Sequence, residues 1–153
     1  MTNSRPHTLC VDDIERLATE RCQALGLRST TQRLEVLKAL AQDHRAHGAY
    51  DIIAMIERAG GGKLAPTAVY RALEFWRDAG LVHKIGGLDR FCVCFNARDH
   101  HSHLVVCCDQ CFTVKEWCDH RAGFDLSQAL NSLGFSNAST SQIEVIARCD
   151  QCI

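Results

Sequence analysis

The chain lacks any hydrophobic run of the roughly 20 apolar residues that a membrane helix needs. Its N-terminus, MTNSRPHTLCVDDIERL, also lacks an apolar stretch of signal-peptide length. Long tandem repeats and low-complexity tracts are missing as well. The length of 153 residues fits one compact domain or two small ones. We therefore expect a cytoplasmic protein with no membrane association.

A strong excess of charge is missing too. The net charge of −1 does not by itself indicate a nucleic-acid partner. The charges are nevertheless distributed unevenly, with a small positive excess in residues 1–88 and a negative excess in residues 89–153. This asymmetry favours a negatively charged partner for the first part of the chain.

Cysteine, in contrast, is abundant, with ten residues beside eight histidines. In a reducing cytosol, paired cysteines indicate metal ligands before disulfides. The motif CDQC occurs twice, and two such pairs complete a tetrahedral zinc shell. We therefore predict a structural zinc held by Cys108, Cys111, Cys149 and Cys152.

Such a zinc would attach the C-terminal strand to the turn at residues 108–111, with a binding free energy of about 10–16 kcal/mol. The alternative is a set of buried or redox-active cysteines. A thioredoxin-type site, however, needs one C-x-x-C at a strand–helix junction, which two copies do not fit.

Hydrophobic spacing predicts four short helices in the first part of the chain. They cover residues 12–25, 30–41, 49–59 and 67–78, and the last is preceded by Pro66 and closed by Gly80. Extended runs at 81–85 and 90–95, separated by Gly-Gly-Leu-Asp, predict a hairpin. This order is typical of a winged helix-turn-helix, whose last helix enters the DNA major groove.

The remaining residues predict an α+β unit after a polar, histidine-rich link. Extended runs at 103–108, 112–117 and 141–149 surround a helix over 124–133. We therefore predict an α+β protein with a winged-helix DNA-binding domain over 1–95, a hinge over 96–102 and a small α+β metal-binding domain over 103–153.

A second set of metal ligands gathers near the junction of the two domains. The residues of this set are His83, Cys94, His100, His101, His103 and Glu116. His83 and Cys94 lie on the two arms of the hairpin, and His101 and His103 would share one face of a strand. We predict a second zinc on His83, Cys94, His101 and Glu116, with His103 as the alternative to His101. The thiolate disfavours an iron site.

Seven segments together are similar to one family of regulators. They are RSTTQRLEVL (28–37), AYDII (49–53), VYRALEFW (69–76), GLVHK (80–84), HHSH (100–103), CDQC with TVKE (108–116) and the second CDQC. Through them the chain resembles the ferric uptake regulator family, and most resembles its zinc uptake regulator branch.

The resemblance implies a homodimeric, metal-dependent repressor whose second domain mediates dimerisation. It implies two zinc ions per chain, a structural one on the four CDQC cysteines and a regulatory one at the hinge. It also implies a palindromic double-stranded DNA operator and neither enzymatic activity nor a small-molecule substrate. The residues that match DNA contacts of the family are Arg28, Tyr50, Tyr70 and Arg71.

Within the expected recognition helix, Arg71 is suited to a bidentate contact with guanine. Tyr70 can contact a thymine methyl or a phosphate, or can be a half-buried core aromatic, and both interpretations stay open here. Phe75 and Trp76 are expected in the core. Because Ala68 stands where the family usually has Thr, we expect Thr67 to cap this helix.

Other functions compete with this interpretation. An iron, nickel or peroxide sensor of the same family is opposed only by Cys94. A zinc hydrolase of the deaminase type needs H-x-E and P-C-x-x-C, and neither motif is present. A protein-interaction domain with a structural zinc predicts neither a second metal site nor DNA binding.

Overall fold

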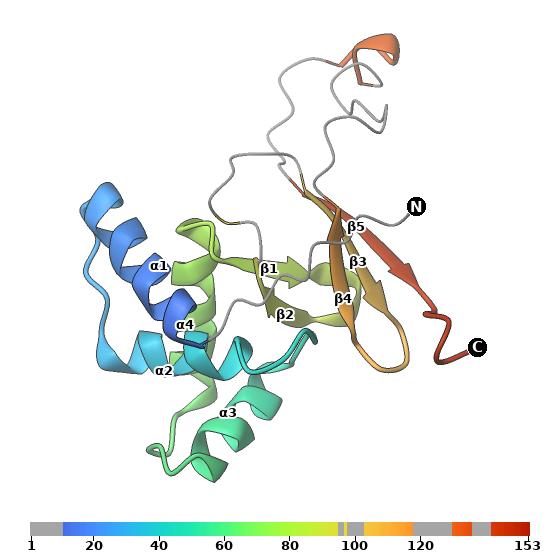
Figure 1. Ribbon diagram of the computed structural model, residues 1–153. Helices are drawn as coiled ribbons and strands as arrows, with labels where there is room; N and C mark the ends of the chain where they lie inside the picture. Colours follow the sequence, from blue (N-terminus) through green and yellow to red (C-terminus); the bar gives the residue numbers. More distant parts are fainter. Residues whose placement is uncertain (1–10, 95–96, 98–102, 118–129, 136–141) are drawn as a thin grey trace. The chain divides into compact units, whose positions relative to one another are not determined.

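The computed structural model describes residues 11–94, 97, 103–117, 130–135 and 142–153 (Figure 1). It divides into two compact units, Met1–Phe95 and Asn96–Ile153, which are described here one at a time. Within the described residues, no helix is both long enough and apolar enough to span a membrane. The predicted hinge lies outside the described residues except for Ala97, which is buried.

The first unit consists of helices followed by a hairpin. Its elements are α1 (Val11–Leu25), α2 (Thr31–Leu40), α3 (Ala49–Arg58), α4 (Pro66–Asp78), β1 (Val82–Ile85), the short 3-10 turn η1 (Gly86–Leu88) and β2 (Arg90–Val93). The predicted order of four helices and a hairpin is confirmed, with ends that differ by up to two residues. Thr30 caps α2 by accepting a hydrogen bond from the Arg33 N–H.

The start of α4 differs from the prediction. Ala65 is the N-cap and Pro66 is the first helical residue, so the expectation that Thr67 caps the helix is wrong. The proline ring fixes the φ angle that a first helical residue adopts, and its missing N–H is one that needs no helical partner. The Ala65 carbonyl accepts the first helical hydrogen bonds, from Ala68 at 2.9 Å and Val69 at 3.2 Å.

The core of the first unit holds α4 against α2. Trp76 is fully buried, and its indole N–H donates a 2.7 Å hydrogen bond to the Arg33 carbonyl of α2. The Arg33 guanidinium lies 3.8 Å from the centre of the half-buried Phe75 ring. The expectation that Phe75 and Trp76 are core residues is therefore met fully by Trp76 and partly by Phe75.

The hairpin is hydrogen-bonded to the segment just before α3. In β1 and β2, His83 pairs with Cys92 in antiparallel register. Phe91, which precedes Cys92 in β2, exchanges two backbone hydrogen bonds with His47, at 2.8 and 2.9 Å. These bonds fix the position of β2 relative to the first turn of α3.

The second unit contains a three-stranded sheet made of β3 (His103–Cys108), β4 (Val114–Trp117) and β5 (Gln142–Ala147). The strand order is β4-β3-β5, with β4 antiparallel and β5 parallel to the central β3 (Figure 1). The three predicted extended runs are therefore confirmed as strands. Of the helix predicted over 124–133, residues 130–132 are helical and residues 124–129 lie outside the described residues.

Candidate metal centre and nucleic-acid interface

The sheet of the second unit delivers both CDQC segments to the same end. The central strand β3 ends at Cys108, and the chain then turns, with Phe112 at a φ of 60° and its N–H bonded to the Cys108 carbonyl at 3.1 Å. Because β5 runs parallel to β3 and Ala147 lies opposite Cys108, the second CDQC starts where the first one starts. Parallel pairing is thus the physical reason that two motifs far apart in sequence meet.

The structure brings the four predicted cysteines together. Their sulfur atoms all lie within 4.8 Å of one another. The Sγ atoms of Cys111 and Cys149 are 3.7 Å apart. A tetrahedron with Zn–S bonds of about 2.3 Å has edges of about 3.8 Å, so this donor set fits a zinc ion.

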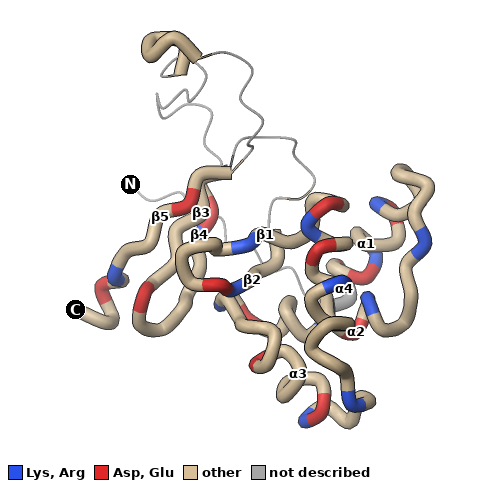
Figure 2. Tube along the Cα trace, turned by 180° about the vertical axis from the view of Figure 1, so that it is seen from behind, with Lys and Arg blue, Asp and Glu red and all other residues tan. Residues whose placement is uncertain are grey.

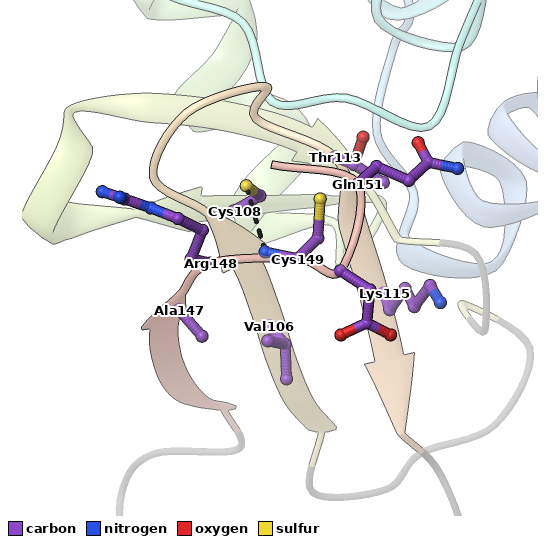
Figure 3. A pocket seen from close by; sticks show the side chains of 9 residues that line it. Val106, Cys108, Thr113, Lys115, Ala147, Arg148, Cys149 and Gln151 are labelled. Carbon is purple, nitrogen blue, oxygen red and sulfur yellow. Dashed lines mark hydrogen bonds between the residues drawn. The ribbon is translucent and has the colours of Figure 1, made fainter. Parts of the chain in front are cut away.

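Backbone N–H groups stabilise the thiolate form of Cys108, the form that binds a cation. Cys108 Sγ accepts hydrogen bonds from the N–H groups of Gln110 and Cys149, each at 3.5 Å, and Figure 3 shows the second of these contacts. Backbone hydrogen bonds, that of Cys111 first, lower the pKa of the Cys108 thiol to about 6. Its thiolate, the form that binds metal, therefore exists near neutral pH.

The four thiols do not ionise alike. The hydroxyl of Thr113, with Oγ1 3.2 Å from Cys111 Sγ, lowers the pKa of Cys111. Hydrogen bonds with the sulfur atoms of Cys149 and Cys111 raise the pKa of Cys152 to about 12. Without a metal the cage therefore keeps protons among its sulfur atoms, and a divalent cation would replace them.

An ion pair connects the two CDQC segments beside the sulfur atoms. The Arg148 guanidinium donates to both carboxylate oxygens of Asp109, at 3.1 and 2.8 Å. The pKa of Asp109 is lowered, chiefly by this hydrogen bonding. A cavity of about 400 Å³ opens next to the pair, with Cys108, Cys149 and Lys115 among its lining residues (Figure 3).

The second predicted ligand set is placed in part. His83 and Cys94 are both buried, and a ring nitrogen of His83 lies within 4.8 Å of Cys94 Sγ. The pleat explains their proximity, because His83 faces Cys92 and Cys94 is two residues further along, on the same side. Glu116 lies on β4, opposite Val105 of β3.

The side chains of the remaining histidines of that set are not described by the structure. His101 lies outside the described residues, as does His100. His103 begins β3, and its side chain also lies outside the described part of the structure. The choice between His101 and His103 therefore stays a prediction.

Helix α4, the predicted recognition helix, exposes one face. Val69, Ala72 and Trp76 are buried, whereas Thr67 and Arg71 are exposed one turn apart. This arrangement leaves the Arg71 guanidinium accessible to a base edge or a phosphate. Figure 2 shows Lys and Arg positions on the helices of the first unit interspersed with acidic ones along the chain trace.

Tyr70 combines the two interpretations that the sequence left open. It is half-buried, and its ring packs edge-on against Phe91 with a centroid distance of 6.2 Å. The ring thus supports the hairpin while remaining partly accessible. Arg28, in contrast, is exposed in the α1–α2 link, where its carbonyl accepts a 2.8 Å hydrogen bond from Arg33.

Tyr50 lies in the first turn of α3 and is 72% exposed. Asp51 beside it accepts a hydrogen bond from the Gly48 N–H at 3.1 Å. The same carboxylate oxygen accepts from Arg90 of β2 at 2.9 Å, and that guanidinium group also donates to the Ala46 carbonyl at 3.2 Å. The helix end that carries Tyr50 is therefore anchored to the hairpin.

Sequence reasoning missed three supporting contacts: the Asp109–Arg148 pair, the Thr113 hydroxyl at Cys111 and the Asp51–Arg90 pair. The first had a visible signal, since an arginine directly precedes the second CDQC and an aspartate follows the first cysteine of each copy. The Thr113 contact depends on the conformation of the turn after Cys111, and the Asp51–Arg90 pair joins α3 to β2, so the sequence reveals neither.

Comparison with known proteins gives matches along most of the chain. A stretch of 138 residues is 32% identical to the "Zinc uptake regulation protein" of Escherichia coli (strain K12), covering 89% of this chain and 79% of that protein. A stretch of 104 residues is 30% identical to the "Ferric uptake regulation protein" of Legionella pneumophila, covering 66% of this chain and 74% of that protein.

Solved structures agree with these sequence matches. A zinc uptake regulator complexed with zinc and DNA superposes with a TM-score of 0.74 and 28% identity, over 93% of this chain and 94% of that one. The crystal structure of holo XcZur gives a TM-score of 0.70 and 30% identity, over 90% and 94%. The sequence model of the Ferric uptake regulator family matches residues 24–145. With this match and relatives of that identity and coverage, the chain belongs to the ferric uptake regulator family.

Proposed function

We propose that this protein is a zinc-responsive, DNA-binding transcriptional repressor that controls genes of zinc homeostasis. The observation that carries the proposal is the buried imidazole–thiol pair of His83 and Cys94 on the hairpin of a winged-helix unit. It occurs in a chain 32% identical to a zinc uptake regulation protein. In this proposal the chain is a regulator and not an enzyme.

The proposed protein holds two zinc ions per chain. The four CDQC cysteines would hold a structural ion, which is supported by their mutual distances and by the low pKa of Cys108. His83, Cys94, His101 and Glu116 would hold a regulatory ion, with His103 as the alternative to His101. A zinc ion there would supply a cross-link among side chains that come from both units.

The sulfur ligand favours zinc over iron as the sensed metal. Thiolate and imidazole ligands suit zinc, whereas oxygen-rich shells suit harder cations. An iron, nickel or peroxide sensor stays the alternative within the family. Operator binding measured with zinc, Fe²⁺ and Ni²⁺ distinguishes a zinc sensor from these alternatives.

The proposed DNA contacts divide into two groups. Arg71, exposed on α4, would read a guanine through a bidentate hydrogen bond worth about 1–3 kcal/mol of discrimination. Tyr50 and Arg28, which are exposed elsewhere on the first unit, would bind phosphates and thereby position the helix. Tyr70 would contact DNA with the part of its ring that Phe91 leaves open.

A homodimer would bind a palindromic operator with one α4 helix in each half-site. Both helices must then keep a separation that matches the DNA helical repeat. Restricting the hinge would raise the fraction of molecules with that separation, and a hundredfold rise corresponds to about 2.7 kcal/mol. We propose that the regulatory ligands serve this restriction.

The test uses the purified full-length protein and an operator selected by the wild type from a random duplex library. Metal content and operator affinity are measured in zinc buffers, and then with Fe²⁺ and Ni²⁺. We expect two zinc ions per wild-type chain. His83→Ala should retain one zinc and its fold, yet lose zinc-dependent DNA binding.

His44→Ala, a change at an exposed histidine of the same unit, is the matched control and should behave as the wild type. Operator binding by His83→Ala that rises with zinc as in the wild type would disprove the regulatory assignment. Tighter operator binding with Fe²⁺ or Ni²⁺ than with zinc would identify one of the other sensors of the family.

A further inference from the structure

We propose that Asp109 and Arg148 act as a clamp that holds the two CDQC segments together and slows release of zinc from the four-cysteine cage. The proposal rests on the structural zinc of the proposed function. It concerns positioning residues, since neither side chain is among the four ligands.

The clamp lies one residue beyond the paired strands. The last register pair of β3 and β5 is Cys108 with Ala147, and the Asp109 N–H extends this ladder by donating to the Ala147 carbonyl at 2.9 Å. Asp109 directly follows one ligand, and Arg148 directly precedes Cys149, another ligand. Separation of the two cysteine pairs would therefore require the ion pair to break.

The Asp109–Arg148 ion pair is bidentate. Arg148 Nε lies 3.1 Å from one carboxylate oxygen of Asp109, and Nη2 lies 2.8 Å from the other. Such a fork fixes both distance and orientation, which a single contact does not. Because Arg148 is half exposed and Asp109 one-third exposed, its effect is reduced by solvent but not abolished.

The need for a clamp follows from the weak anchoring of β5 within the protomer. Its residues Val145 and Ile146 are 39% and 43% exposed, and Ala147 is also exposed. Little apolar surface therefore holds the strand, and β3 alone pairs with it in the described sheet. Contacts at the end of β5 therefore add to its pairing with β3 in keeping the second CDQC in place.

The repeated motif supplies its own control. Each CDQC carries an aspartate after its first cysteine, Asp109 in one copy and Asp150 in the other. Asp150 is exposed, and the described part of the structure records no ion pair for it. The residue before the first copy is Cys107, whereas Arg148 precedes the second, so the two aspartates differ in partner but not in motif.

The experiment compares zinc release by Asp109→Asn, Arg148→Gln, the double variant and the control Asp150→Asn. Full-length, zinc-loaded proteins carrying His83→Ala are mixed with a chromogenic chelator, so that release reports the cysteine cage. We expect Asp109→Asn and Arg148→Gln each to release zinc about threefold faster, and Asp150→Asn to be unchanged. The double variant should be no faster than the faster single variant, because one shared contact is lost.

A second measurement separates the clamp from general damage to the site. With Co²⁺ in place of zinc, the absorption of the tetrahedral four-thiolate site should be the same in all variants. If Asp109→Asn fails to fold, the exchange of the pair, Asp109→Arg with Arg148→Asp, should recover slow release.

Equal release rates for Asp109→Asn and Asp150→Asn would overturn the clamp, as would additive effects in the double variant. Failure of the exchanged pair to recover slow release would also count against it. Loss of the structural zinc from the wild type would instead refute the proposed four-cysteine site, so the two failures are distinguishable.

Discussion

Replacement of Trp76 by phenylalanine tests whether one buried contact sets the position of α4, the predicted recognition helix. The Trp76 indole is fully buried in the first unit and donates a 2.7 Å hydrogen bond to the Arg33 carbonyl of α2. Its ring also packs against Phe75 with a centroid distance of 4.8 Å. Phenylalanine keeps an aromatic ring at this position but removes the N–H donor and part of the volume.

The expected cost has two parts. The Arg33 carbonyl lies inside α2 and has a helical partner there, so loss of the indole bond costs about 1 kcal/mol rather than the larger penalty of an orphaned buried group. The smaller ring leaves a cavity, which adds about 1 kcal/mol. A loss of about 2 kcal/mol lowers the melting temperature of a unit of this size by about 10 °C.

Thermal and urea unfolding of the full-length protein, followed by circular dichroism, measures this loss. The matched control is Trp117→Phe, the same chemical change at a tryptophan on β4 that is 54% exposed. We expect the control to cost less than about 0.5 kcal/mol. Equal losses for the two variants would refute the argument that burial and the Arg33 bond make Trp76 important.

Three further outcomes are expected. Cys152→Ser should lose one zinc per chain and dissociate or unfold, as seen by metal analysis and sedimentation; full zinc retention would contradict the cage. Arg90→Ala should remove the contact to Asp51, cost about 1 kcal/mol and speed amide exchange at residues 48–52; unchanged exchange there would show that the pair does not anchor α3. The lowered pKa of Cys108 predicts stabilisation by its thiolate that is complete above the ordinary thiol pKa and lost as the pH falls through about 6. Ultraviolet titration of the metal-free protein should therefore show a thiolate step near pH 6 that Cys108→Ser removes, and a first step only near pH 9 would be contrary to this assignment.

Most of the architecture could be predicted because its signals are local. Helical periodicity and the Gly-Gly-Leu-Asp turn indicated the order of elements in the first unit. The start of α4 was predicted one residue late, because the fixed φ of Pro66 prevails over the capping preference of Thr67. Family resemblance suggested a side-chain cap at a place where the backbone alone begins the helix.

The candidate sites contain some contacts that local sequence signals predict and others that they do not. The proximity of His83 and Cys94 follows from the pleat once the hairpin register is known, and the predicted turn nearly determines that register. The Asp51–Arg90 pair joins a helix to a strand 39 residues away. Its two residues fit no ligand or catalytic pattern, so only packing in three dimensions reveals it.

The parallel pairing of β5 with β3 has a consequence that the cysteine spacing alone does not give. An antiparallel β5 would place the residues after it at the opposite end of β3 from Cys108, so the second CDQC could not reach the first by a short path. With the observed register, Cys149 follows the last paired residue by two positions, and its N–H reaches Cys108 Sγ at 3.5 Å. The positions of the four sulfur atoms therefore depend on the direction and register of β5, and any change that reverses or shifts this strand must separate them. A bound zinc ion would accordingly stabilise the observed register over its alternatives.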